Sequence, residues 1–245
     1  MSDTKFCHYT TIDNARNILR GGSFYMSEMS QMNDVGEADK HKEKSGTLFV
    51  NCFCHSEAKN IPMFYLYGGI DGKGCRVEFT ESRLKKLVEN CQVYPVNDKC
   101  QMLKQPFDGS EYEIACDWIY YMTPRGFYKY KNTEVLPLET YEATIEKLHK
   151  EGKDVFIKDY IWRYENEYRI LVRFKNPIKY KRVAIKFDIG EKERGISMMC
   201  GPETEDVELT KIQEEFRNYG IMKITRPNKM GVRMGLVEKN RRLYK

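Results

Sequence analysis

Residues 168–200 decide the fold class, and they read YRILVRFKNPIKYKRVAIKFDIGEKERGISMMC. Three runs in this stretch, at residues 168–174, 183–188 and 195–200, are short and mostly apolar, which is typical of strands. No helical pattern separates them. Parallel strands need a long crossover connection, usually a helix, so strands joined this directly are expected to pair antiparallel. The stretch predicts an α+β protein with a mostly antiparallel sheet, and not a doubly wound α/β fold.

The regions on either side continue this pattern. Towards the N-terminus, the hydrophobic periodicity predicts strands at residues 5–9, 23–27, 47–54 and 74–80. Helices are expected at residues 10–20, after Pro62, at 82–90 with Ser82 as the N-cap, and at 139–151. Towards the C-terminus, a helix at 204–218 precedes a strand at 221–226. Residues 28–45 are expected to be irregular, and the long segment 95–137 is expected to be a functional insertion or to carry small helices.

The composition is that of one folded domain. The chain has 245 residues, 41% hydrophobic and 31% charged, so we expect residues 1–245 to share a single core with an insertion at about 95–137. No run approaches the roughly 18 apolar residues of a membrane span. The first ten residues, MSDTKFCHYT, lack the pattern of a signal peptide. We therefore expect a soluble, cytoplasmic protein without a membrane partner.

The eight cysteines are expected to be reduced thiols, because disulfides are rare in cytoplasmic proteins. Cys52, Cys54 and His55 are close in sequence and raise the possibility of zinc. No second CxxC or HxxxH pair completes a four-ligand set. The sequence therefore predicts no metal site.

The positive charge is concentrated at the C-terminus. The chain carries a net charge of +5, but residues 221–245 alone carry +7, so the remainder sums to −2. A basic tail is either a solvated chain end or a footprint for nucleic acid. The segment 95–137 adds aromatic residues that could stack unpaired bases, namely Tyr120, Tyr121, Phe127, Tyr128 and Tyr130. Together they favour single-stranded nucleic acid as a partner, with core-filling aromatics and a solubilising tail as the alternative.

Three sets of polar residues stand where strands meet loops: His8; Ser27 with Asn33, Asp34 and Glu37; and Tyr65 with Tyr67. Each set has an ordinary structural explanation. A histidine in an apolar strand can be a satisfied core residue. Clustered Asn and Asp residues usually bond their own backbone in a turn. Tyrosines on a short helix are usually core or rim residues.

A fourth set lies in WRYENEYRILV, residues 162–172. Glu165 and Glu167 stand two residues apart at the expected start of a strand, where alternation would direct both to the same face. Two adjacent carboxylates repel each other, so at least one is expected to have a raised pKa or to bind a donor. The alternative is a salt-bridged strand edge formed with Arg163 and Arg169.

An ordered set of motifs resembles a widespread bacterial family of unknown function. The motifs are FCHYTTIDNARNILRGGSFYMS, QMNDVGE, LFVNCFCHSE, PMFYLYGG, GCRVEF and WRYENEYRILV. They match that family's His-Tyr-Thr, Asn-Asp-x-x-Glu, Cys-Phe-Ser, aromatic helix and Trp-x-x-Glu-x-Glu-x-Arg patterns in order. Nearly the whole chain is covered, except residues 95–137.

The layout is in turn similar to the ADP-ribosyltransferase fold, which has a split, mostly antiparallel β-sheet core flanked by helices. In the poly-ADP-ribose polymerase and diphtheria-toxin branch, a first-strand His, Tyr residues near a following helix and a late Glu form the NAD site. His8 matches the His, and Asn166-Glu167-Tyr168 resembles the Asn-Glu-Tyr around the catalytic Glu. Glu165 and Glu167 also resemble the Glu-x-Glu of arginine-modifying toxins. The segment HYTTIDNARNILRGG looks like the opening of toxins that ADP-ribosylate DNA.

The resemblance implies a role for each matched residue. Glu167 would bind the ribose hydroxyl and stabilise an oxocarbenium-like transition state, while Glu165 would orient or deprotonate the nucleophile. Tyr67, or alternatively Tyr65, would stack on nicotinamide. His8 would bind the adenosine ribose or the amide. The rest of the expected NAD-binding set is Tyr9, Thr10, Ser27, Asn33 and Asp34, the last two on a covering loop.

The sequence thus predicts an NAD-dependent ADP-ribosyltransferase. Its acceptor is expected to be a macromolecule, RNA or DNA before protein, and a toxin or phage-defence effector with a neutralising partner would fit. Two other classes remain open: a non-catalytic module of the same fold that binds a nucleotide or nucleic acid, and a scaffold that binds a partner protein.

Overall fold

The computed structural model describes residues 5–55, 60–123, 126–129, 132–135, 138–188 and 195–227, and the side chains of 126–141 are left aside. The elements of the N-terminal half are β1 (Lys5–Thr10), α1 (Ile12–Gly21), β2 (Ser23–Glu28), η1 (Met29–Gln31), α2 (Val35–Lys40), η2 (Lys42–Lys44), β3 (Leu48–His55), α3 (Ile61–Tyr67), β4 (Cys75–Thr80), α4 (Glu81–Glu89), β5 (Gln92–Val96) and β6 (Tyr112–Trp118).

The C-terminal half adds two groups of elements. The first is β7 (Tyr120–Thr123), β8 (Gly126–Lys129), β9 (Asn132–Val135), α5 (Leu138–Lys150), η3 (Asp154–Phe156) and β10 (Ile157–Asp159). The second is η4 (Tyr160–Glu165), β11 (Glu167–Phe174), β12 (Arg182–Lys186), β13 (Ile196–Cys200), α6 (Asp206–Arg217) and β14 (Ile224–Thr225).

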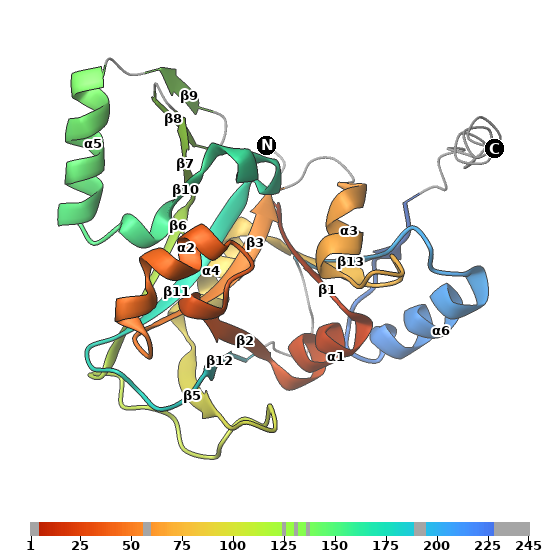
Figure 1. Ribbon diagram of the computed structural model, residues 1–245. Coiled ribbons are helices and arrows are strands. Elements are labelled where there is room, and N and C mark those ends of the chain that lie inside the picture. The colour runs from red at the N-terminus through yellow and green to blue at the C-terminus, as the bar shows by residue number, and fades with distance from the viewer. Residues whose placement is uncertain are drawn as a thin grey trace, which may run out of the picture.

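The main sheet confirms the predicted α+β class. Within the described part of the chain it has ten strands, ordered β14-β13-β4-β1-β3-β2-β12-β5, with β11 and then β6 branching from β3. All of its pairs are antiparallel except β13 with β14. No helix separates β11, β12 and β13 along the chain, but these strands do not pair with one another (Figure 1). Instead, β11 pairs with β3 and β6, β12 with β2 and β5, and β13 with β4 and β14.

The sheet is split at β3. On one edge β3 pairs with β11 along its whole length. On the other edge its end pairs with β1 through His55 and Cys54, while its beginning pairs with β2 through Val50 and Phe49. Since β1 and β2 meet the same edge at different places, the two strands diverge and leave a gap beside the middle of β3.

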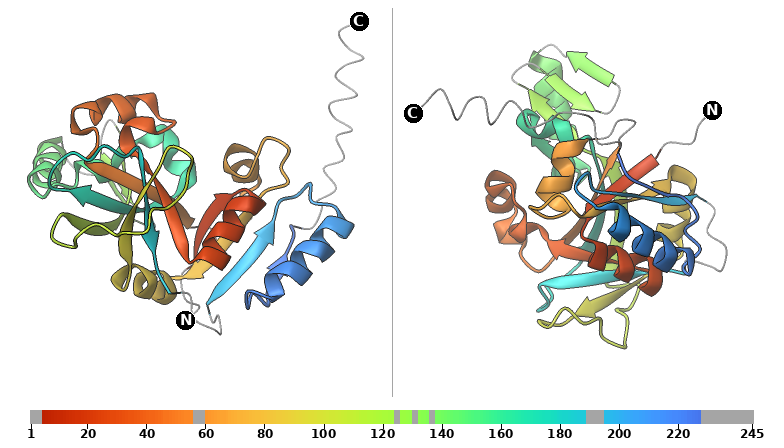
Figure 2. Two further views of the ribbon diagram at one scale, coloured as in Figure 1. Left: turned by 90° about the horizontal axis from the view of Figure 1, so that it is seen from below. Right: turned by 90° about the vertical axis from the view of Figure 1, so that its right-hand side faces the viewer.

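The sheet has a continuous core on one face and a divided one on the other. Helices α1, α4 and α6 cover the first face, where their apolar side chains pack against the phenylalanines of β1, β2, β3 and β4. On the second face, α3 packs over β1 and β3 at one end. At the other end Met29, Val155 and Tyr121 pack over β3 and β11. The space between these two apolar clusters holds the polar residues described below. Figure 2 shows α1 beside α6, which an ion pair between Arg16 and Glu215 joins.

Several sequence expectations were wrong in detail. Within 95–137 the described residues contain strands and none of the small helices that were one of the two expectations: β6 joins the main sheet, and β7, β8 and β9 form a second sheet with β10. This second sheet and α5 project at one end of the molecule (Figure 1). Residues 28–45 contain α2 and two short 3₁₀ helices. The N-cap of α4 is Thr80, whose hydroxyl accepts from the Arg83 N–H, and not Ser82.

Candidate active site

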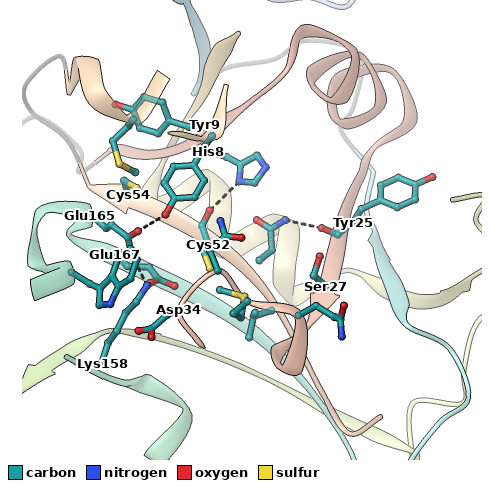
Figure 3. Close-up of a pocket in the computed structure, with 18 residues that line it drawn as sticks. His8, Tyr9, Tyr25, Ser27, Asp34, Cys52, Cys54, Lys158, Glu165 and Glu167 are labelled. Atoms are coloured by element: carbon teal, nitrogen blue, oxygen red, sulfur yellow. Dashed lines mark hydrogen bonds and ion pairs between the residues drawn. The ribbon is translucent and has the colours of Figure 1, made fainter. Parts of the chain in front are cut away.

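A cavity of about 280 Å³ lies at the gap in the sheet, on the face between the two apolar clusters. It takes side chains from β1, β2 and β3, from α3, and from the segment that enters β11. Figure 3 shows residues from all of these elements converging on one space. Because β1 and β2 diverge there, the site combines segments far apart in sequence.

His8 bridges the gap from β1 to β3. Its Nδ1 lies 2.9 Å from the Cys52 carbonyl oxygen and must donate to it, since a carbonyl can only accept. Burial lowers the pKa of His8, although the Cys52 carbonyl opposes that shift. The ring is therefore a neutral imidazole whose Nε2 is left as an acceptor. On the other side of the gap, Asn51 Nδ2 donates to the Tyr25 carbonyl at 2.9 Å.

Glu165 and Glu167 converge, but not through strand alternation. Glu165 ends the 3₁₀ helix η4 and Glu167 begins β11. Asn166 between them has φ +44°, a left-handed conformation that asparagine tolerates better than most residues. The Asn166 side chain donates to the His55 carbonyl at 3.1 Å, which fixes the turn. The expectation that both carboxylates lie on one strand face was wrong, because the left-handed turn brings them together.

Lys158 on β10 links the two carboxylates. Its Nζ lies 2.7 Å from Glu165 Oε2 and 3.3 Å from Glu167 Oε2. All three side chains are at least 96% buried. The ammonium also lies 4.8 Å from the centre of the Trp162 ring, a cation–π contact. In the view of Figure 3, the lysine side chain extends from below towards Glu165 and Glu167.

The remaining oxygens of the two glutamates have different partners. Glu167 Oε1 accepts from Arg169 Nε at 2.7 Å. Glu165 Oε1 accepts a short hydrogen bond from the Tyr67 hydroxyl. Arg169 is fully buried and also donates to Glu37 Oε1 at 2.5 Å and to the Val155 carbonyl at 2.7 Å. The predicted alternative of a salt bridge between Glu167 and Arg169 is therefore present, whereas the Arg163 guanidinium lies over the Tyr160 ring.

This hydrogen-bonded chain contains one surplus carboxylate. Its acids are Glu37, Glu165 and Glu167, and its bases are Lys158 and Arg169. An uncompensated buried charge is costly, so the chain favours either a bound proton or a cation in the cavity.

The pKa values of the two glutamates are shifted in opposite directions. Burial tends to raise the pKa of Glu167, but Arg169 and Lys158 together outweigh burial and lower it to about 2. For Glu165 burial dominates, and the neighbouring Glu167 charge adds to it, so its pKa is raised despite Lys158. Glu167 is thus a fixed anion, and Glu165 is the carboxyl group of the two that binds a proton more readily.

Tyr121 supports the same place from the second sheet. It is 1% exposed, and its hydroxyl oxygen accepts from the Glu167 backbone N–H at 2.8 Å. The prediction that Tyr121 stacks on unpaired bases is therefore wrong, because the ring is buried. Tyr120 is half-buried. Tyr130 lies outside the described residues, and for Phe127 and Tyr128 the structure describes the backbone only.

Eight of the ten predicted site residues line this cavity: His8, Tyr9, Ser27, Asn33, Asp34, Tyr67, Glu165 and Glu167. Thr10 is buried in β1 and Tyr65 donates to Glu203 at 3.0 Å, and neither belongs to the lining. Of the two tyrosines, Tyr67 is therefore the one that lines the cavity. Asp34 also caps α2 by accepting from the Glu37 N–H at 3.3 Å, so the turn interpretation is confirmed for this residue.

The cavity adjoins a second one of about 370 Å³, since Ser27 and Gln31 line both. Lys181 and Arg182 supply cations to the second cavity, opposed there by Asp98. The two adjoining cavities therefore form a cleft with an acid-rich end near Glu165 and a more basic end at β12, where Lys181 Nζ also lies 3.5 Å from Glu28 Oε2.

Sequence reasoning missed Lys158 and the contacts of Tyr121 with Glu167. Lys158 stands nine residues before Glu167 in a segment without a distinctive motif, so no local signal marked it. No group of three potential metal ligands is found among the residues that the structure describes. Most of the basic tail, residues 228–245, lies outside the residues that the structure describes. Of its cations, Arg226 is bound to Asp206 at 2.7 Å.

Comparisons with protein-family models, with curated proteins and with solved structures found no match. Among the described helices, none is both long enough and apolar enough to cross a membrane.

Proposed function

We propose that this protein transfers ADP-ribose from NAD to an acceptor, with the cavity at the gap between β1 and β2 as its active site. The observation that carries the proposal is the surplus carboxylate in the series of hydrogen-bonded side chains that begins at Glu37 and ends at Tyr67. This series borders a cavity lined by aromatic rings. The nicotinamide ring of NAD is positively charged, and its departure leaves an oxocarbenium-like cation. Both states suit a fixed anion and an aromatic wall.

Each residue has a chemical role in this proposal. Glu167, held anionic by Arg169 and Lys158, stabilises the developing positive charge, as carboxylates do in glycoside cleavage. Glu165 takes the proton from the attacking acceptor group. Tyr67 stacks on the nicotinamide, and the Nε2 of His8 accepts from a ribose or amide group. The basic end of the cleft at Lys181 and Arg182 suits the diphosphate.

The test is incubation of the purified protein with NAD, followed by measurement of released nicotinamide. Release that requires the protein supports the transferase. NAD binding measured by calorimetry without release supports a non-catalytic nucleotide-binding module. If the protein neither binds NAD nor releases nicotinamide, the partner-binding scaffold is the remaining class. Mass analysis of RNA, DNA and protein from expressing cells would identify the acceptor and show whether the protein acts as a toxin or defence effector.

A further inference from the structure

The second sheet reaches the cavity through two side chains. Lys158 on β10 and Tyr121 on β7 are register partners in a parallel pair. In-register neighbours on adjacent strands leave a sheet from the same face. The Lys158 ammonium and the Tyr121 hydroxyl both end at Glu167, one at Oε2 and the other at the backbone N–H. Four segments of the chain therefore meet at Glu167: β3, β7, β10 and η4.

We propose that Lys158 is a positioning residue of the site, delivered by the second sheet to hold the carboxylates of Glu165 and Glu167 side by side. One Nζ lies 2.7 Å from Glu165 Oε2 and 3.3 Å from Glu167 Oε2, so a single ammonium contacts both acids. Without that charge the acids would repel each other across a buried space. The role of Lys158 in turnover rests on the proposed function, while its effect on the carboxylates does not.

The surroundings of Lys158 show that the residue does not serve solubility. Its side chain is 4% exposed, so it contributes little to solubility. Burial acts to lower its pKa, but the two glutamates raise the pKa overall and keep the ammonium charged. The charged groups that face the cluster from the packed elements are Arg169 from β11 and Glu37 from α2. Arg169 already binds Glu167 and Glu37. Among the described residues, Lys158 is therefore the cation that pairs with Glu165.

The proposal predicts how the glutamates titrate when the charge is removed. In Lys158→Met, carbon-13 signals of the labelled carboxyl groups should show Glu167 protonating at a pH higher by about one unit or more, because an opposite charge at this distance shifts a pKa by that much. Glu165→Gln and Glu167→Gln assign the two signals. Lys158→Arg keeps the charge and should restore most of the wild-type titration.

Lys153→Met is the matched control, since Lys153 precedes the same strand but pairs with Glu151 at 3.2 Å and not with the cluster. It should titrate as the wild type does. If the Lys158→Met curves superimpose on the wild-type curves, the proposal is overturned. Should Lys158→Met fail to fold, as judged by circular dichroism, Lys158→Gln serves for the same comparison, and superimposed curves there overturn the proposal equally.

Turnover provides a second readout. If the protein releases nicotinamide, Lys158→Met should lower kcat at least tenfold with KM for NAD nearly unchanged, and should shift the acid limb of the kcat profile. A wild-type kcat and pH profile in Lys158→Met would overturn the positioning role. If the wild type releases no nicotinamide, the proposed function is overturned instead. The carboxyl titration would still decide whether Lys158 controls the protonation of Glu165 and Glu167.

Discussion

Glu165 and Glu167 accept hydrogen bonds from the same atom, Nζ of Lys158, yet their pKa values are shifted in opposite directions. The difference arises from their second partners. Glu167 has a guanidinium on its other oxygen, while Glu165 has a phenolic hydroxyl there. An environment that separates the pKa values of two adjacent acids assigns them different tasks, one as a fixed charge and the other as a proton carrier.

The first prediction concerns Glu167. Glu167→Gln keeps the shape of the side chain and removes the charge, so nicotinamide release should slow by roughly two to three orders of magnitude. Glu113→Gln is the control, because Glu113 is exposed on β6 and pairs only with Arg173 among the contacts described. Release at the wild-type rate in Glu167→Gln would remove this residue from the catalytic set.

The second prediction separates the two functions of Tyr67. Tyr67→Phe retains the ring but loses the hydrogen bond to Glu165, so KM for NAD should change little while kcat falls about tenfold, the effect of about one charge-assisted hydrogen bond. Tyr67→Ala should also raise KM. Tyr65→Phe, whose hydroxyl binds Glu203 outside the cavity, should leave both constants unchanged. Equal effects of the Phe changes at positions 65 and 67 would contradict this assignment.

The third prediction concerns stability. Arg169→Met removes the guanidinium that pairs with Glu37 and Glu167, leaving two buried carboxylates short of a partner. The free energy of unfolding should fall by about 3–5 kcal/mol, the cost of breaking a buried ion pair from one side. Arg173→Met, at a half-exposed position of the same strand, should cost much less. Urea unfolding of the three proteins measures the difference.

The fourth prediction concerns His41, which is 1% exposed at the end of α2. Neither of its ring nitrogens has a hydrogen-bond partner among the described residues. Burial, then repulsion from Lys40, lowers the pKa of His41 from 6.5 to about 4. The unfolded chain binds a proton near pH 6.5 and the folded chain only near pH 4, so stability is greatest above pH 6.5 and declines as the pH falls towards 4.

The loss across that interval is at most about 3.5 kcal/mol, from a shift of about 2.5 pKa units at about 1.4 kcal/mol each. His41→Gln should flatten the dependence of urea unfolding on pH just below 6.5, where carboxyl groups with ordinary pKa values are still ionised. A slope as steep in His41→Gln as in the wild type would show that another group controls it.

The fifth prediction concerns the acceptor. If the acceptor is single-stranded nucleic acid, filter binding of a short RNA should weaken steeply between about 50 and 200 mM salt, because lysine and arginine contacts release counterions. Changing Lys239, Arg241 and Arg242 to Gln should reduce that slope. The same change at Lys86, Lys175 and Lys179, exposed elsewhere on the surface, should not. No binding at low salt would leave protein or a small molecule as the acceptor.

The sequence by itself determined the fold class and most of the elements. The strands at residues 168–200 have a local hydrophobic pattern that marked them as strands, whereas their partners β3, β2 and β4 lie far away in the sequence and were set by the tertiary structure. The positions of His8, Tyr67, Glu165 and Glu167 at the ends of elements also made them candidates, and the cavity brings these four together. Their roles in NAD chemistry stay predictions.

The tertiary structure alone decided how these groups are charged and held. Lys158 reaches the glutamates because β10 pairs in register with β7, a long-range contact that no local pattern encodes. The left-handed turn at Asn166, and not strand alternation, brings the carboxylates together. Burial and neighbouring charges then set unlike pKa values for two chemically identical side chains, because both effects depend on distance in space and not on separation along the chain.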